Sequence, residues 1–185
     1  MTAPASRFTA SQDDGFVALD QCHRNSLQCL AHLAELVERV ARNGADAKVR
    51  RLADDIVEHF STVARRHHED EERHVFPPLI AKGDPQTVQA VLRLQQDHNW
   101  IEEDWMEIRP QLDAIAAGQN WVDIDLLREQ TEVFSALMRD HIALEESYVY
   151  PEARAGMAPT ARHEMGREMA ARRRATRAKA HAGTR

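Results

Sequence analysis

The 185-residue sequence has few of the residues that build tight turns, disulfide frameworks and membrane spans. Glycine and proline number seven each, aromatic residues make up 5% of the chain, and hydrophobic residues make up 43%. These proportions disfavour a turn-rich β-sandwich and a disordered chain, and they favour a compact helical protein. Because domains hold roughly 100 to 200 residues, a chain of this length has room for one domain with a single sizeable core.

The scarcity of cysteine and of long apolar runs excludes further classes. Cys22 and Cys29 lie seven residues apart and form no Cys-x-x-Cys motif. They indicate neither a disulfide framework nor a thiolate zinc site, so we expect reduced, buried thiols. No apolar run approaches the roughly 20 residues of a membrane span, and residues 1–14 contain no apolar stretch of a secretory signal. We therefore expect a cytoplasmic protein without membrane attachment.

Charge is unevenly distributed along the chain. The net charge of −6 divides into +6 over residues 160–185 and −12 over the remainder. The basic segment includes Arg172-Arg173-Arg174, but no aromatic residues alternate with its charges and no nucleic-acid-reading motif is present. We expect a solvated helix end or tail there, open to a protein partner, rather than a nucleic-acid-binding surface.

The sequence divides into a small polar N-terminal arm (1–12), expected to be disordered, a helical region (13–151) and a basic C-terminal helix or tail (152–185). In the helical region, apolar residues recur every three or four positions over four segments. We predict helices from Asp13 or Asp14 to Asn43-Gly44, from near Asp46 to before Pro77, from Gly83-Asp84-Pro85 to before Gly118 with a kink at Pro110, from Asp123 to before Pro151, and a shorter basic one from Thr160. Four long helices with short loops predict an all-α, up-down-up-down four-helix bundle.

Histidine interrupts the apolar face of each predicted long helix near its middle. In three of the helices a glutamate follows the histidine four residues later, which places both side chains on one helix face. A single pair of this kind is more often a surface hydrogen bond than a metal site, so a metal site is indicated only if several helices bring such residues together. The first helix supplies His23 without a following glutamate, and the other three supply the pairs His67 and Glu71, His98 and Glu102, and His141 and Glu145.

Counting residues from the connecting loops predicts that the four histidines share one layer. His23 and His67 lie 19 and 21 residues from their common loop, and His98 and His141 lie 19 and 18 residues from theirs. At about 1.5 Å per residue, these differences amount to about 3 Å or less along the bundle. Burying four imidazoles with carboxylates costs several kcal/mol unless they find partners. Imidazole and carboxylate are metal ligands, so a metal is the simplest partner.

The two halves of the helical region repeat each other. The segment Glu71-Glu72-Arg73-His74-Val75-Phe76-Pro77 parallels Glu145-Glu146-Ser147-Tyr148-Val149-Tyr150-Pro151. The histidines show the same relation, since His23 and His67 are 44 residues apart and His98 and His141 are 43 apart. Each half is therefore a helix hairpin that supplies one lone histidine and one His-x-x-x-Glu motif.

On these motifs, the sequence from about Phe16 to Pro151 resembles the hemerythrin-like, or HHE cation-binding, family. The mark of that family is a duplicated pattern of a histidine, then His-x-x-x-Glu-Glu and an aromatic-Pro exit. The resemblance implies a left-twisted four-helix bundle with two non-heme irons, bridged by two glutamates and an oxo or hydroxo group. It also implies binding of O2, NO or peroxide for sensing, storage or stress response. The position-matched metal ligands are His23, His67, Glu71, His98, His141 and Glu145.

Glu102 is where the sequence departs from oxygen-carrying hemerythrins, which have a second histidine one turn after the third-helix histidine. Two octahedral irons have about twelve coordination positions, and the matched ligands with a bridging oxygen fill about ten. We expect Glu102 to take one of the others as a further metal ligand. An anionic donor favours ferric iron, so we expect oxidation rather than clean release of O2. The alternative is that Glu102 stays off the metal and donates a proton to bound peroxide.

Several neighbouring residues have alternative roles. His68, with Glu72 as its partner four residues later, is an alternative to His67 as a ligand, but the repeat and the apolar stripe favour His67. Tyr148 lies one turn beyond Glu145 and either packs at the edge of the core or hydrogen-bonds a bound ligand. We expect hydrogen-bonded rim positions for His59 and His74.

Three classes of function fit these features. The first, which we favour, is a di-iron module that binds O2, NO or peroxide. The second is an oxidoreductase that reduces peroxide or NO, or that donates iron for metal-centre repair. The third is a helical interaction protein whose polar layer is structural or holds zinc. No nucleotide-binding loop, nucleophile elbow or catalytic triad pattern is visible in the sequence.

Overall fold

The structure is a computed structural model that describes residues 14–119 and 121–182. Over these ranges the chain is helical with short connections and contains no β-strand. The helices of this part of the chain are all too short or too polar to cross a lipid bilayer. In chain order the elements are α1 (Gly15–Asn43), α2 (Ala47–Glu58), the π-helical η1 (His59–Ala64), α3 (Arg65–His74), α4 (Phe76–Lys82), α5 (Pro85–Ala116), α6 (Ile124–Leu144), the π-helical η2 (Glu145–Val149), α7 (Tyr150–Gly156) and α8 (Pro159–Ala182).

Aspartates begin the long helices, as the sequence predicts. Asp14, Asp46, Asp84 and Asp123 each accept hydrogen bonds from backbone N–H groups in the first turn of α1, α2, α5 and α6. Such caps satisfy amide groups that have no partner within the helix. The predicted N-terminal arm (1–12) and Asp13, the other candidate cap of α1, lie outside the described residues.

Helix α3 ends at His74, before Pro77, as the sequence predicts, but helical structure resumes after one residue. The chain enters α4 at Phe76 with Pro77 in its first turn, and it passes from η2 directly into α7 at Tyr150, with Pro151 in the same position. Proline is tolerated there because the amide groups of a first helical turn have no partner within the helix. Helix α5 also continues through Pro110 to Ala116.

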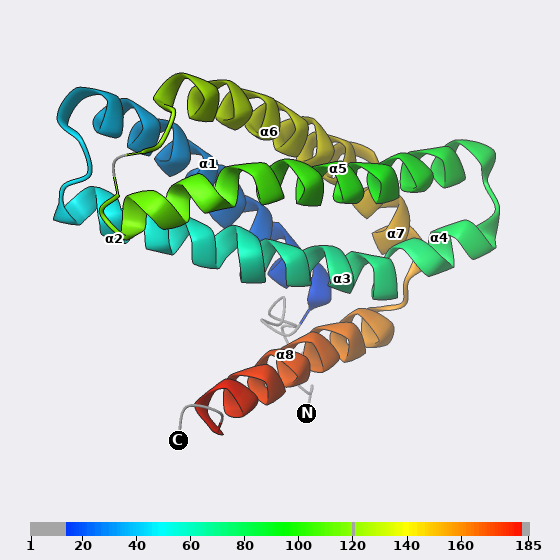
Figure 1. The fold of residues 1–185 in the computed structure, drawn as a ribbon. Coiled ribbons are helices and arrows are strands. Elements are labelled where there is room, and N and C mark those ends of the chain that lie inside the picture. Colours follow the sequence, from blue (N-terminus) through cyan, green and yellow to red (C-terminus); the bar gives the residue numbers. More distant parts are fainter. Residues whose placement is uncertain (1–13, 120, 183–185) are drawn as a thin grey trace, which may run out of the picture.

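The long helices lie side by side (Figure 1), and α1 and α5 each contact both α2 and α6. Two apolar clusters fill the interior. The first includes Leu30, Leu33, Ile101, Ile108 and Phe134, and the second includes Phe16, Leu19, Phe76, Leu94 and Tyr150. Along α1 and along α5, a histidine stands between residues of the two clusters. The interior is therefore apolar at both ends of the bundle and polar in a layer between them.

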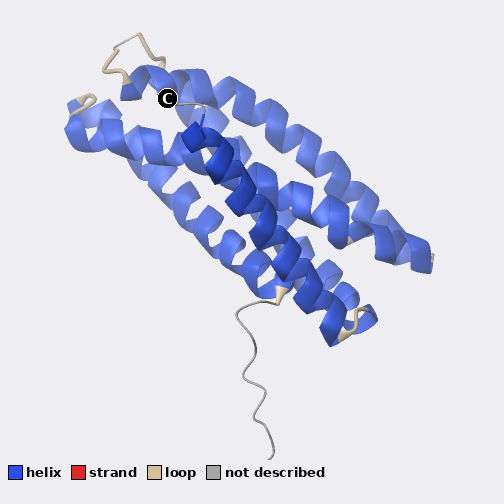
Figure 2. Ribbon diagram, turned by 90° about the horizontal axis from the view of Figure 1, so that it is seen from below, coloured by secondary structure: helices blue, strands red, loops and turns tan. Residues whose placement is uncertain are grey.

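The basic C-terminal segment forms a long helix, α8, that packs against the bundle. It contacts α1 and lies along one face of the bundle (Figure 2). Met165 and Met169, four residues apart, are 4% and 1% exposed and belong to the second apolar cluster. Gly15 permits this approach, because a Cβ atom there would lie 2.6 Å from Met165. The expectation of a solvated end is thus wrong for this part of the segment, because two methionines give the helix an apolar stripe.

Two of the arginines in the basic segment also have a partner within the chain. Asp70 on α3 is 2% exposed and forms ion pairs with Arg172 and Arg173 of α8. The Arg173 Nη2 atom lies 2.9 Å from Asp70 Oδ2. Part of the positive charge that the sequence left without a partner therefore compensates a buried carboxylate.

We expect Met169→Ala to lower the free energy of unfolding by about 2 to 5 kcal/mol, the range for truncating a buried methionine. Met106→Ala is the matched control, since Met106 is 59% exposed, and its effect should stay within about 0.5 kcal/mol. Denaturant unfolding of the metal-free variants measures both values. Equal stability of the two variants would show that α8 is not part of the cooperative unit.

Candidate metal centre

The layer between the apolar clusters consists of histidine and glutamate side chains from four parts of the bundle. His23 comes from α1, His67 and Glu71 come from α3, His98 comes from α5, and His141 and Glu145 come from α6 and the start of η2. All six residues are buried, and the most exposed of them, His98, is 9% exposed. The structure thus brings together every residue that matched the family pattern.

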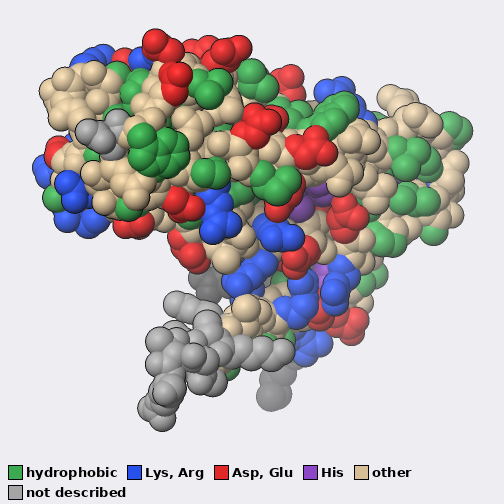
Figure 3. All heavy atoms as spheres, viewed as in Figure 1, with side chains coloured by type: hydrophobic (Ala, Val, Ile, Leu, Met, Phe, Trp, Pro, Cys, Tyr) green, Lys and Arg blue, Asp and Glu red, His purple; other side chains and the backbone are tan. Residues whose placement is uncertain are grey.

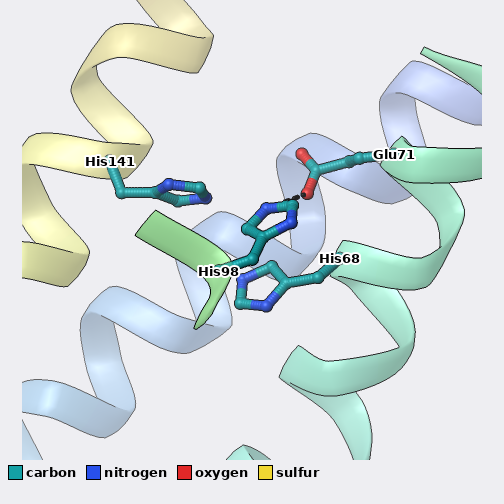
Figure 4. Close-up of side chains that lie close together, drawn as sticks. All are labelled: His68, Glu71, His98 and His141. Carbon is teal, nitrogen blue, oxygen red and sulfur yellow. Dashed lines mark ion pairs between the residues drawn. The ribbon is translucent and has the colours of Figure 1, made fainter. Parts of the chain in front are cut away.

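Together with His68, these side chains form two groups that share Glu71. The potential ligand atoms within each group all lie within 4.8 Å of one another. One group is His23, His67, Glu71 and Glu145, and the other is His68, Glu71, His98 and His141. Figure 4 shows the second group, with Glu71 directed at His98.

Both glutamates direct one oxygen to each side of the layer. Glu71 Oε1 lies 3.4 Å from His67 Nε2, and Glu71 Oε2 lies 3.5 Å from His98 Nε2. Glu145 Oε2 lies 3.0 Å from the Nε2 atom of His23, and its Oε1 lies 3.1 Å from that of His141. Each of the two carboxylates therefore faces histidines on both sides of the layer.

The second glutamate of each Glu-Glu pair holds a histidine of the other half of the repeat. Glu72 Oε1 lies 3.0 Å from His98 Nδ1, and Glu146 Oε1 lies 3.0 Å from His23 Nδ1. A carboxylate at Nδ1 fixes the ring orientation and leaves Nε2 without a proton to face a metal. The duplicated Glu-Glu motif therefore supplies one glutamate to the layer and one to its outer support.

Aromatic residues of the two aromatic-Pro motifs pack on the same two histidines. The Tyr150 ring stacks on His23 with centroids 5.2 Å apart, and the Phe76 ring stacks on His98 at 5.6 Å. The Tyr150 hydroxyl donates a hydrogen bond to Glu71 Oε1. Tyr148, the tyrosine considered from the sequence, instead contacts Thr87 through its hydroxyl at 3.0 Å. The repeat alignment of Tyr150 with Phe76 was the available signal for this missed residue.

The layer holds protons in the metal-free state. Burial and the charge of Glu145 raise the pKa of Glu71 to about 7. Burial lowers the pKa of His141, but Glu145 and Asp97 outweigh it and raise the pKa to about 10. Burial and the neighbouring His23 hold the pKa of His67 well below 6.5. At neutral pH, His141 is therefore protonated and His67 is neutral.

Polar atoms without hydrogen-bond partners are concentrated in this layer. A buried polar atom without such a partner costs roughly 1 to 3 kcal/mol. A set of imidazole nitrogens and carboxylate oxygens is suited to first-row transition metals, so the residues present fit a metal. In the described part of the chain, the atoms of the layer and of the adjacent Asp97 that make no hydrogen bond, although all except His67 Nδ1 lie in ion-pair contacts, are His67 Nδ1, Glu71 Oε2, Asp97 Oδ2, His98 Nε2, His141 Nδ1 and Nε2, and both carboxylate oxygens of Glu145.

The sequence matches the family described as the hemerythrin HHE cation binding domain over residues 14–153. The chain belongs to this family. It is also 30% identical over 164 residues to a protein of Haemophilus influenzae described as uncharacterized, an alignment that covers 89% of this chain and 92% of the relative. Membership confirms the resemblance that the duplicated motifs indicated.

Glu102 lies outside both groups of this HHE domain, contrary to the expectation that it is a ligand. Its side chain is 42% exposed, and its Oε1 lies 3.7 Å from Arg65 Nη1. The buried stripe of α5 runs through Leu94, Ile101 and Trp105. These residues lie on one side of His98 around the helix, and Glu102 lies on the other. Glu102 therefore adds no anionic donor to either group, so the structure gives no support to the expectation that it favours ferric iron.

His68 enters the layer together with His67 rather than replacing it. The two rings point toward different neighbouring helices, because adjacent helical residues diverge by about 100°. His67 Nε2 lies 2.9 Å from His23 Nε2 on α1, whereas the His68 ring stacks on His98 of α5 with centroids 4.1 Å apart. The sequence offered the two histidines as alternatives, and the structure places both in the layer.

The other histidines considered are at the rim, as expected. His59 Nε2 lies 2.9 Å from Ser26 Oγ, and His74 Nε2 lies 2.8 Å from Glu168 Oε2.

Cys22 precedes His23 in the sequence. Burial raises the pKa of its thiol to about 12, so Cys22 carries no thiolate at neutral pH.

A surface hollow of about 580 Å³ between α3 and α5 leads to the layer. His68 and His98 line it, together with Arg65, Arg73 and Glu102. On this face of the molecule, histidine is visible among acidic and basic side chains (Figure 3). A small polar molecule can therefore approach the histidines from solvent.

We expect Glu146→Gln and Glu72→Gln each to weaken metal binding by about 10- to 100-fold, since outer carboxylates orient the ligating histidines. Competition against a chromophoric chelator, with Fe²⁺ or Zn²⁺, measures the affinity. Glu103→Gln removes an exposed glutamate from α5 and is the control. Equal affinities for all three variants would contradict the supporting role.

Metal loading should release protons, because ligands bind metals in their deprotonated forms. His141, with a pKa of about 10, is protonated at pH 7 in the metal-free protein. We therefore expect release of at least one proton per chain at pH 7 and a metal affinity that rises as pH increases from 7 toward 10. A pH indicator in weakly buffered solution measures the release, and its absence would show that His141 is neutral before loading.

Proposed function

We propose that this HHE domain binds two non-heme irons per chain and, at that centre, a small ligand such as O2, NO or peroxide, for sensing, storage or stress response. The observation that carries the proposal concerns Glu71 and Glu145. Each directs one of its two oxygens to one group of histidines and the other oxygen to the second group. One metal site would not need two shared carboxylates. We also propose that the four long helices follow an up-down-up-down order and that these carboxylates link them across the layer.

The four matched histidines divide between the two irons. His23 and His67 would hold one iron, and His98 and His141 would hold the other. A bound iron pair supplies redox chemistry and coordination of small ligands. The chain supports that centre with its own residues, since the Tyr150 hydroxyl donates to Glu71 and the apolar clusters exclude water above and below the layer.

The hollow between α3 and α5 is the proposed route for the small ligand. Arg65 and Arg73 contribute positive charge to its lining, and Glu102 contributes a carboxylate near the mouth. A carboxylate in that place can exchange protons with solvent and with an entering peroxide. Glu102 therefore retains the second role considered from the sequence, that of a proton donor off the metal.

An oxidoreductase that reduces peroxide or NO, or that donates iron for metal-centre repair, is the second candidate. The buried Tyr150 hydroxyl favours it, because burial and the charge of Glu71 raise the Tyr150 pKa well above 10, so the hydroxyl stays protonated and can donate a hydrogen bond. A hydrogen-bond donor next to the proposed centre can stabilise negative charge that develops as peroxide is reduced. Repeated turnover with an added reductant distinguishes this candidate from simple binding.

The test is the metal content of anaerobically purified protein, with near-ultraviolet spectra recorded before and after air and then azide. We expect about two irons per chain and charge-transfer bands that shift with azide. The bands should be lost in a His67→Ala, His141→Ala double variant and kept in His32→Ala, which alters a histidine outside the layer. Zinc, or no metal after attempted reconstitution with iron, would contradict the proposal and leave a structural polar layer.

A further inference from the structure

The two halves of the layer are related by the repeat, but they differ at one position inside it. His68 follows His67 in the first half, whereas Ile142 follows His141 at the matching position of the second half. Ile142 is buried in the first apolar cluster at 3% exposure. An imidazole thus occupies a place where the repeat otherwise tolerates a purely apolar side chain.

The His68 ring lies closest to the histidines of one side, and the ring of its sequence neighbour His67 is farther away, with centroids 5.7 Å apart. Its centroid is 4.1 Å from that of His98, with the rings nearly parallel, and 5.4 Å from that of His141. A ring nitrogen of His68 lies within 4.8 Å of ligand atoms of Glu71, His98 and His141. Figure 4 shows the three histidines on one side of Glu71.

His68 lies between the apolar interior and the surface. A small hollow beside it is lined by Phe60, Ala64, Ile101 and Trp105 together with Arg65 and Glu102, and His68 also lines the larger surface hollow. The ligand atoms that gather around its ring are those of Glu71, His98 and His141. The other candidate for a seventh donor, Glu102, faces Arg65 at the exposed edge.

We propose that His68 is a fifth imidazole ligand, completing the metal position formed by His98 and His141. The inference rests on the proposed di-iron function. It makes the two positions unequal, with three imidazoles at one and two, His23 and His67, at the other.

The two positions also differ in the aromatic residue beside them. The Tyr150 hydroxyl lies at the position with two imidazoles, 3.2 Å from His23 Nε2, while the matching aromatic residue at the other position, Phe76, has no hydroxyl. The extra nitrogen donor and the hydrogen-bond donor are therefore on opposite sides of the layer.

His68→Ile tests the assignment, because it installs the side chain that the other half of the repeat carries at this position. We expect wild-type protein to bind two irons per chain with two distinct Mössbauer signals. The variant should retain one iron and bind the second at least about 10-fold more weakly, the lower end of the loss seen for outer-shell changes. Glu103→Gln, which alters an exposed glutamate of α5, is the control and should bind both irons with wild-type affinity.

A second variant distinguishes the loss of a ligand from the loss of folding. In His68→Ala, added imidazole should restore the second iron and its Mössbauer signal, whereas added imidazole should not change wild-type loading. Circular dichroism of the metal-free variants verifies that the helices are intact. Two irons with unchanged affinity and spectra in His68→Ile, or no rescue by imidazole in His68→Ala, would overturn the ligand assignment while leaving the di-iron proposal in place. Failure of the wild-type protein to bind iron would overturn both.

Discussion

The structure depends on a layer of buried imidazoles and carboxylates held between two apolar clusters. Glu71 and Glu145 are fully buried and face the nitrogens of histidines on both sides. Each fully buried large apolar side chain contributes roughly 1.5 to 3 kcal/mol, so the two clusters can offset the cost of a polar layer that lacks a full set of hydrogen bonds. A metal would remove that cost directly, because it binds the same nitrogens and oxygens. Stability and function therefore depend on the same few atoms.

The repeat explains how a short sequence builds this layer. Each half contributes an inward glutamate, and the glutamate after it supports a histidine of the opposite half. The aromatic residues before the prolines cross over in the same way, since Tyr150 packs on His23 and Phe76 packs on His98. The halves thus hold each other's ligands in place, and neither hairpin can form its site alone. Helix α8 adds a further restraint through Asp70, the residue before Glu71.

Much of the helical pattern and the membership of the layer could be predicted from the sequence. Apolar periodicity and aspartate caps located the helices, and residue counts from the loops placed four histidines at one level. The failures have physical causes. The spacing of four residues did not show on which side of His98 the buried stripe of α5 lies, so it did not distinguish the partly exposed Glu102 from the inward Ile101. Adjacent residues were treated as alternatives, although His67 and His68 can face two different neighbouring helices. In the basic segment, two methionines were too weak a pattern to reveal packing of α8.

The most direct test of this account is a crystal structure of the iron-loaded protein with anomalous data collected at the iron absorption edge. The account predicts two anomalous peaks inside the bundle, with Glu71 and Glu145 bonded to both. One peak should lie within bonding distance of His23 and His67, and the other within bonding distance of His68, His98 and His141. A single peak, or peaks outside this layer, would contradict the central claim that the buried polar layer is a two-metal site.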